Sequence, residues 1–262
     1  MAQQDRCVLV VGAGGGIGSA LLDQAHADVG VTTLIASARH LDAKPHSSLT
    51  HTEAPSARAT VHWLAMDYGE PASMATLADQ VAELTPRIDL LLCASGQLAV
   101  PADRSTHGVA RLPEKQLADL DMDWMMRSYQ VNAAGPVQLV AALAPLLKAA
   151  QAPVVGLLSA QVGSIADNQL GGWYSYRMAK AALNMGVKTL SVELSRWRND
   201  ACITAIHPGT TLTPLSEPFV KRRRQPVRTP TETAEKIYRL VQGLDKQNNG
   251  SFLTLDGIPL PW

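Results

Sequence analysis

The 262-residue sequence predicts an α/β fold, in which a doubly wound parallel sheet of about seven strands has helices on both faces. Short β-rich apolar runs alternate with longer stretches of helical spacing, a pattern typical of such sheets. The first run, residues 7–11, is continuously apolar and ends in glycines, as expected of a strand buried on both faces. Because no repeat or linker between separate cores is present, residues 1–262 are expected to form a single domain.

The strands are predicted where apolar and β-branched residues form short runs. In order along the chain, these runs are residues 7–11, 32–37, 60–66, 88–94, 154–158, 203–206 and 251–255.

The helices are predicted where apolar residues recur at helical spacing. These stretches are residues 17–29, 74–84, 123–150, 174–198 and 231–243. The long stretch 123–150 contains Pro136 and Pro145, so a kink or an early break is expected there. Two segments interrupt the alternation. Residues 43–59, rich in Pro, Ser, Thr and His, are expected to be a surface loop, and residues 214–230 carry the basic run 221–224.

Composition narrows the possible partners. The 23 Lys and Arg residues balance 23 Asp and Glu residues, which argues against nucleic acid or an anionic membrane as the main partner. No apolar run reaches the roughly 18 residues of a membrane span, and no signal-peptide core precedes the first strand. Three widely spaced cysteines predict no disulfide framework, and no metal-binding motif is present. A cytoplasmic protein that acts on a small molecule is therefore expected.

A glycine-rich loop follows the first predicted strand and opens the first predicted helix. Glycine permits unusual φ values and lets the backbone approach a pyrophosphate, while the helix N-terminus favours the phosphate charge. A plain glycine turn is the alternative, but the strand–turn–helix context favours a Rossmann-type dinucleotide site. The candidate cofactor residues in this loop are Gly12, Gly14, Gly15, Gly16, Ile17 and Gly18.

The end of the second strand indicates which dinucleotide binds. Residues 36–40 contain no Asp or Glu that could accept hydrogen bonds from both ribose hydroxyls. Arg39 offers a planar guanidinium suited to a 2′-phosphate, although an exposed arginine after a strand is also common. NADP(H) is therefore predicted as the cofactor in preference to NAD.

Tyr176 and Lys180 lie four residues apart on a predicted helix and therefore share one face. A phenol has an ordinary pKa of about 10, and a nearby ammonium group lowers it toward the range that acid/base catalysis needs. Tyr174 has no lysine four residues further on and is the weaker candidate. An ordinary amphipathic helix would also contain such a pair, but its position after the fifth strand favours catalysis.

Taken together, the glycine loop, Arg39, Asp67, the Tyr176/Lys180 pair and the segment 207–209 resemble the short-chain dehydrogenase/reductase family over essentially the whole chain. The sequence of residues 163–184 is similar to the C-factor-like subgroup, which is close to carbonyl reductases.

The resemblance implies roles for further residues. Asp67 would contact the adenine, Asn132 would hold a helix kink and a water linked to Lys180, and Lys180 would also bind the nicotinamide ribose. The segment 210–230 would cover the substrate, and a homodimer or homotetramer is expected. The remaining implied cofactor contacts are Ala94, Gly96, Pro208, Gly209, Thr211 and Thr213.

The chain departs from the family pattern at two places. The family's Asn-Asn-Ala-Gly after the fourth strand is Cys-Ala-Ser-Gly at residues 93–96, so other hydrogen bonds are expected to hold that strand end. The position of the family's catalytic serine is occupied by Ala160. Ser159, or alternatively Ser164, is predicted to supply the hydroxyl that polarises the substrate. Its loss would cost about 2–4 kcal/mol in the transition state.

These features predict an NADPH-dependent oxidoreductase that reduces an aldehyde or ketone by hydride transfer, or oxidises the alcohol, with Tyr176 as acid/base. The alternative is an NADP(H)-binding regulatory or signalling protein with weak or no catalysis. Ala160 favours this alternative, whereas the presence of Tyr176, Lys180 and Asn132 together argues against it.

Overall fold

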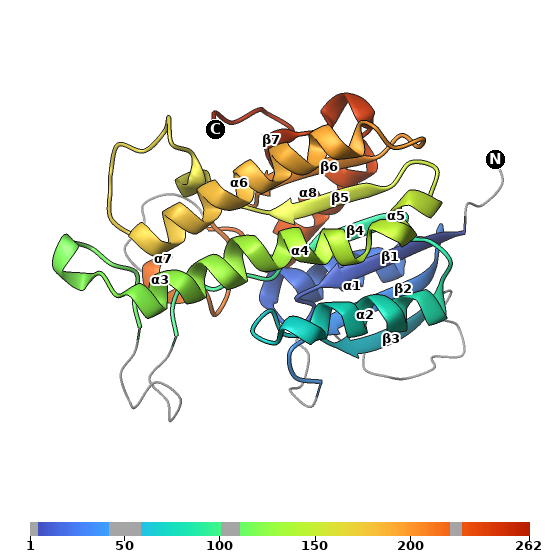
Figure 1. The fold of residues 1–262 in the computed structure, drawn as a ribbon, viewed down its shortest axis with the longest axis horizontal. Coiled ribbons are helices and arrows are strands. Elements are labelled where there is room, and N and C mark those ends of the chain that lie inside the picture. The colour runs from blue at the N-terminus through green and yellow to red at the C-terminus, as the bar shows by residue number, and fades with distance from the viewer. Residues whose placement is uncertain (1–4, 42–58, 101–110, 221–226) are drawn as a thin grey trace.

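The computed structural model describes residues 5–41, 59–100, 111–220 and 227–262. Its strands form one seven-stranded sheet in the order β3-β2-β1-β4-β5-β6-β7, and all neighbouring pairs are parallel (Figure 1). The predicted fold class is confirmed. The strands are β1 (Arg6–Val11), β2 (Val31–Ala38), β3 (Thr60–Ala65), β4 (Leu90–Cys93), β5 (Val154–Leu158), β6 (Cys202–His207) and β7 (Ser251–Thr254).

Helices cover both faces of the sheet (Figure 1). One apolar cluster joins the sheet to α2, α4, α5 and α6, and a second joins its other face to α1 and α8. Strand β1 serves both clusters: Leu9 faces the first and Val10 the second, which explains its continuous apolar sequence. The helices are α1 (Gly16–Ala27), α2 (Pro71–Leu84), α3 (Met122–Tyr129), α4 (Gly135–Ala142), α5 (Ala144–Ala149), α6 (Tyr174–Leu194), α7 (Glu217–Val220) and α8 (Pro230–Gln242).

The predicted long helix 123–150 is divided into three helices, as its prolines indicated. A π-helical turn, Gln130–Ala134, separates α3 from α4, and α5 begins after Leu143. Pro136 and Pro145 lie in the first turns of α4 and α5, where a missing N–H costs little. The π-helical turn contains the predicted active-site residue Asn132.

The sheet order places a switch point between β1 and β4, because the chain continues from β1 toward one edge and from β4 toward the other. Ligands of open parallel sheets bind at such points, outside the carboxyl ends of the strands.

Other sequence predictions differ in detail or lie outside the described residues. Strand β4 is shorter than the predicted run 88–94, and α6 ends at Leu194 rather than near residue 198. The predicted surface loop lies outside the described residues except for Ala59, as does the basic run 221–224. The three cysteines are buried and unpaired. Within the described residues, no helix is long and apolar enough to cross a membrane, and no acidic, His or Cys cluster could hold a metal ion.

Candidate active site

The glycine loop between β1 and α1 is packed so closely that side chains do not fit. Gly12 has a φ of +82°, and a Cβ there would lie 2.7 Å from the Ser95 nitrogen. A Cβ on Gly18 would lie 2.0 Å from the Gly12 carbonyl oxygen. The Ser37 carbonyl accepts hydrogen bonds from the Gly12 and Ala13 amides, both at 2.9 Å. The loop is thereby fixed against the carboxyl ends of β2 and β4.

The surroundings of this loop fit a dinucleotide pyrophosphate. Gly14 and Gly15 are exposed, Gly15 is the N-cap of α1, and the first turn of α1 contains no acidic residue. Ile17 is half-buried in that first turn. The Ser37 hydroxyl is fully buried without a hydrogen-bond partner among the described residues. A helix N-terminus of this kind attracts an anion.

The residues predicted to recognise the adenosine lie together beyond β2 and β3. Arg39 is exposed immediately after β2. The Met66 amide donates to the Ala38 carbonyl at 3.0 Å, which brings Asp67 to the same end of the sheet. The Asp67 Oδ1 atom accepts from the Gly69 amide at 2.8 Å.

The segment after β6 approaches the glycine loop from the other side. A Cβ on Gly16 would lie 2.9 Å from the Thr213 Cγ2 atom, so Thr213 covers the start of α1. Thr211 is buried, and its hydroxyl shares a 2.8 Å hydrogen bond with the Thr233 hydroxyl. Pro208 and Gly209 are half-buried, and Gly209 has a φ of +68°.

Three residues predicted as catalytic or linking groups meet around Gly96. The Lys180 Nζ atom donates to the Leu158 carbonyl at 2.9 Å and lies 5.7 Å from the centre of the Tyr176 ring. A Cβ on Gly96 would lie 3.9 Å from this Nζ and 3.3 Å from Asn132 Oδ1, so Gly96 separates the two groups. The Tyr176 phenol makes no hydrogen bond to any described residue, and its side chain is half-buried.

Asn132 and a cluster of three polar groups hold the segment after β4. The Asn132 amide donates to the Gln97 carbonyl at 2.7 Å and accepts from the Gln97 N–H at 2.8 Å. The Tyr68 hydroxyl lies 3.1 Å from Cys93 Sγ and accepts from the Ser95 hydroxyl at 3.1 Å. The prediction that other hydrogen bonds replace the missing asparagines at this strand end is confirmed. Ala94 is half-buried beside them, and its amide donates to the Val11 carbonyl at 2.8 Å.

The electrostatics of the Tyr–Lys pair differ from the sequence prediction. Burial raises the pKa of Tyr176 to about 12 and lowers the pKa of Lys180 to about 8. The predicted net lowering of the Tyr176 pKa is therefore not found in the protein alone. Desolvation disfavours the charged form of both groups.

The two candidate serines are both engaged elsewhere. The Ser159 hydroxyl is buried and donates to Asn184 Oδ1 on α6 at 2.6 Å. The Ser164 hydroxyl accepts from the Asp167 amide at 3.1 Å and donates to the Trp262 carbonyl at 3.3 Å. Neither makes a hydrogen bond to Tyr176, so the geometry speaks against the predicted role of Ser159.

The sequence predictions missed two residues that contact the start of α6. Glu114 is buried, and its carboxylate accepts hydrogen bonds from the Ser175 amide and hydroxyl, one residue before Tyr176. Phe219 of α7 packs edge-on against Trp173 with a centroid distance of 5.3 Å. No sequence motif could have predicted either contact, because each joins residues that are distant in the sequence.

Two cavities lie away from Tyr176. One, of about 460 Å³, is bounded by residues of α3 and the π-helical turn, including Met126 and Tyr129. The other, of about 540 Å³, lies at the amino ends of the strands beside Arg6 and Asp89.

Known proteins are similar to this chain in sequence. An uncharacterized oxidoreductase of Schizosaccharomyces pombe is 28% identical over 273 residues, which cover all of both chains. The C-signal protein of Myxococcus xanthus is 32% identical over 147 residues, covering 56% of this chain and 83% of that protein.

Solved structures share the fold. The carbonyl reductase Sniffer of D. melanogaster matches with a TM-score of 0.81 at 23% identity, covering 99% of this chain and 100% of that chain. The NADPH-bound carbonyl reductase from chicken fatty liver matches with a TM-score of 0.82 at 23% identity, covering 99% of this chain and 95% of that chain. A family model for short chain dehydrogenases matches residues 6–224. This protein belongs to the short-chain dehydrogenase family.

Proposed function

We propose that the protein is an NADPH-dependent oxidoreductase that reduces an aldehyde or ketone to the alcohol, with the reverse oxidation also possible. The observation that carries the proposal is the Tyr176 phenol, which has no hydrogen bond to a described residue and lies beside buried Lys180. A phenol without a partner next to a cation is suited to donating a proton to a substrate oxygen. The chicken carbonyl reductase with the same fold is bound to NADPH.

In this proposal, NADPH supplies the reducing equivalent for the carbonyl carbon, while the protein supplies the proton and the electrostatics. Tyr176 donates its proton to the developing alkoxide. Lys180, protonated below a pKa of about 8, stabilises the resulting phenolate. Asn132 holds the backbone of Gln97 next to Gly96 and so maintains the space beside Lys180. Ser159 has no role in this mechanism, because its hydroxyl donates to Asn184.

The predicted cofactor contacts would lie along the carboxyl ends of the strands. The glycine loop would hold the pyrophosphate, Arg39 the 2′-phosphate and Asp67 the adenine, with the segment 208–213 on the nicotinamide side. The Arg39→Asp variant tests the phosphate contact. We expect it to lose its preference for NADPH over NADH, and an unchanged preference would contradict the assignment.

A second candidate function is an NADP(H)-binding regulatory protein with little catalysis. It is favoured by Ala160 and by the engagement of both nearby serine hydroxyls elsewhere, which leaves the substrate oxygen without that donor. The relative named C-signal fits this alternative by its name alone.

One experiment separates the two candidates. NADPH oxidation is measured with a panel of aldehydes and ketones, using the native protein and Tyr176→Phe at equal NADPH occupancy. If the protein is a reductase, we expect the native protein to turn over at least one carbonyl compound and the Tyr176→Phe variant to do so about 100-fold or more slowly. Tight NADPH binding with no turnover of any carbonyl would favour the regulatory function.

We also propose that the protein is a cytoplasmic homodimer or homotetramer. Met126 and Tyr129 on α3 and Met185 on α6 are exposed apolar side chains on helices that pack against each other. Such a surface is suited to an interface between subunits. Light scattering of the purified protein would test this, and a monomer at micromolar concentration would contradict it.

A further inference from the structure

The proposed acid Tyr176 and two further aromatic side chains lie in a continuous series of ring contacts, although aromatics make up only 5% of the chain. The Trp173 ring contacts Tyr176 with a centroid distance of 6.4 Å and Phe219 with a distance of 5.3 Å. The interplanar angles of 73° and 63° are those of edge-to-face pairs, which aromatic rings favour. Phe219 belongs to α7, which lies at the N-terminal end of α6 (Figure 1).

Trp173 has an unusual backbone conformation. With φ at 52° and ψ at 40°, it is the only non-glycine residue of positive φ in the described part of the chain. Gly171 and Gly172 before it also have φ values of 62°. A bulky residue in this region is strained, and such strain persists where surrounding structure imposes it, often at functional sites.

The surrounding hydrogen bonds impose this conformation. The Trp173 amide donates to the Glu114 carbonyl at 2.5 Å. The Arg177 Nε atom donates to the carbonyls of Gly171 and Gly172 at 3.2 and 3.0 Å, and Nη1 donates to the Val162 carbonyl at 3.2 Å. The backbone that carries the Trp173 ring is therefore held in place by the protein itself.

The rings of Trp173 and Phe219 are not used to fill the core. Both side chains are half-buried. The other phenylalanine, Phe252, shows the contrast, since it is 2% exposed and belongs to the first apolar cluster. Trp173 and Phe219 thus keep apolar surface available next to Tyr176.

We propose that Trp173 and Phe219 form an aromatic wall that selects carbonyl substrates carrying an aromatic or conjugated ring. This inference rests on the proposed reductase function and names its substrate class. In this proposal, a carbonyl compound that receives the Tyr176 proton lies beside Trp173, whose ring centroid is 6.4 Å from that of Tyr176. Ring–ring contacts favour an aromatic substituent over a saturated ring of equal size.

The first test compares benzaldehyde with cyclohexanecarbaldehyde, which match in size but differ in aromaticity. We expect the native protein to have a kcat/KM about fivefold or more higher for benzaldehyde. Phe219→Leu keeps an apolar side chain, and Trp173→Gly suits the positive φ, so both variants should fold. Both are expected to lose most of the ratio, whereas Trp197→Leu, which changes a half-buried aromatic residue beyond the far end of α6, is expected to keep it. An unchanged ratio in both wall variants would overturn the proposal.

The second test does not depend on turnover. Binding of benzamide and of cyclohexanecarboxamide to the protein saturated with NADP⁺ is measured by calorimetry. We expect benzamide to bind about fivefold or more tightly to the native protein, and the two ligands to bind equally to Phe219→Leu. This preference with no turnover of any aldehyde would refute the reductase function but support the wall. Equal binding of both ligands by the native protein would refute the wall.

Discussion

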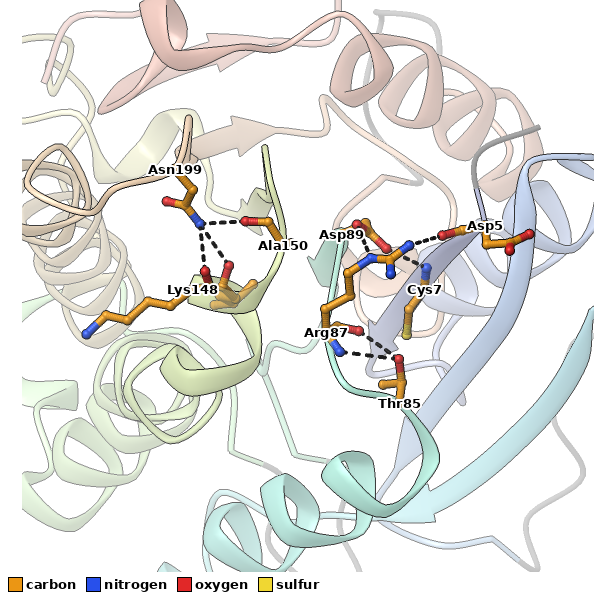
Figure 2. Close-up of polar contacts among 9 residues, drawn as sticks. Asp5, Cys7, Thr85, Arg87, Asp89, Lys148, Ala150 and Asn199 are labelled. Carbon is orange, nitrogen blue, oxygen red and sulfur yellow. Dashed lines mark hydrogen bonds and ion pairs between the residues drawn. The ribbon is translucent and has the colours of Figure 1, made fainter. Parts of the chain in front are cut away.

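At the amino ends of the strands polar side chains bond mainly to one another and to nearby backbone, whereas at the carboxyl ends several have no partner among the described residues. Figure 2 shows the first arrangement. Asp89 accepts from the Cys7 amide at 2.8 Å and from Arg87 Nε at 3.1 Å, and Arg87 also donates to the Asp5 carbonyl. Asn199 donates to carbonyls around α5, although its Oδ1 atom is buried without a described partner.

The carboxyl ends contain the opposite features. The Ser37 hydroxyl is buried without a described partner, and the Tyr176 phenol makes no hydrogen bond to a described residue. Lys180 is buried without a carboxylate partner among the described residues, and Trp173 has a strained backbone. Isolated polar groups and strain cost stability, so their concentration at one end indicates that this end is arranged for ligands. The amino ends, by comparison, are arranged for stability.

Substituting one cation at each end gives the largest expected contrast. We expect Lys180→Met to lower kcat/KM for carbonyl reduction by about 1,000-fold, because the phenolate loses its stabilising charge. Its free energy of unfolding should not fall, since a desolvated amine is removed. Arg87→Met should do the reverse and lower the free energy of unfolding by about 1 kcal/mol, with kcat/KM unchanged. Urea denaturation and steady-state kinetics measure both quantities, and a loss of activity in Arg87→Met would break the contrast.

The glycine loop gives the next largest effect. In Gly18→Ala, the new Cβ would lie 2.0 Å from the Gly12 carbonyl oxygen, so the loop must move. We expect the Kd for NADPH to rise by about 10- to 100-fold, the effect of 1–3 kcal/mol of overpacking. Gly243→Ala is the control, because its Cβ would meet the Leu240 carbonyl oxygen at an ordinary 3.5 Å. Equal NADPH affinity in both variants, measured by fluorescence titration, would argue that the loop does not contact the cofactor.

The serine position tests which side chains face the substrate. We expect Ala160→Ser to raise kcat/KM by about tenfold, because it adds a hydroxyl where the family pattern has one. Ser159→Ala should chiefly lower the free energy of unfolding, by about 1–3 kcal/mol, because Asn184 loses a buried partner. A tenfold loss of kcat/KM in Ser159→Ala, with stability unchanged, would instead restore Ser159 as the polarising hydroxyl.

The outcome of the sequence predictions follows from the range of the interactions that decide each feature. Local pattern was sufficient for β5, whose bounds match the prediction, and for the break at Pro145. The direction of the Ser159 hydroxyl depends on Asn184, which lies one helix further along the chain. The contact between Trp173 and Phe219 and the pKa direction of Tyr176 depend on packing and burial, which no local motif encodes.

The smallest expected effect is the pH dependence of reduction. Lys180 has a pKa of about 8 in the protein without cofactor, so half of its charge is lost at that pH. Because the proposed proton transfer leaves a phenolate that needs this charge, kcat/KM, which reports the free enzyme, should be about twofold lower at pH 8 than on its acidic plateau. Tyr176 does not interfere, since its pKa of about 12 keeps the phenol protonated in this range. Arg87→Met, altered at the opposite end of the sheet, should show the same profile. A kcat/KM that stays level to pH 9.5 in both proteins would mean that the lysine charge does not take part in the reaction.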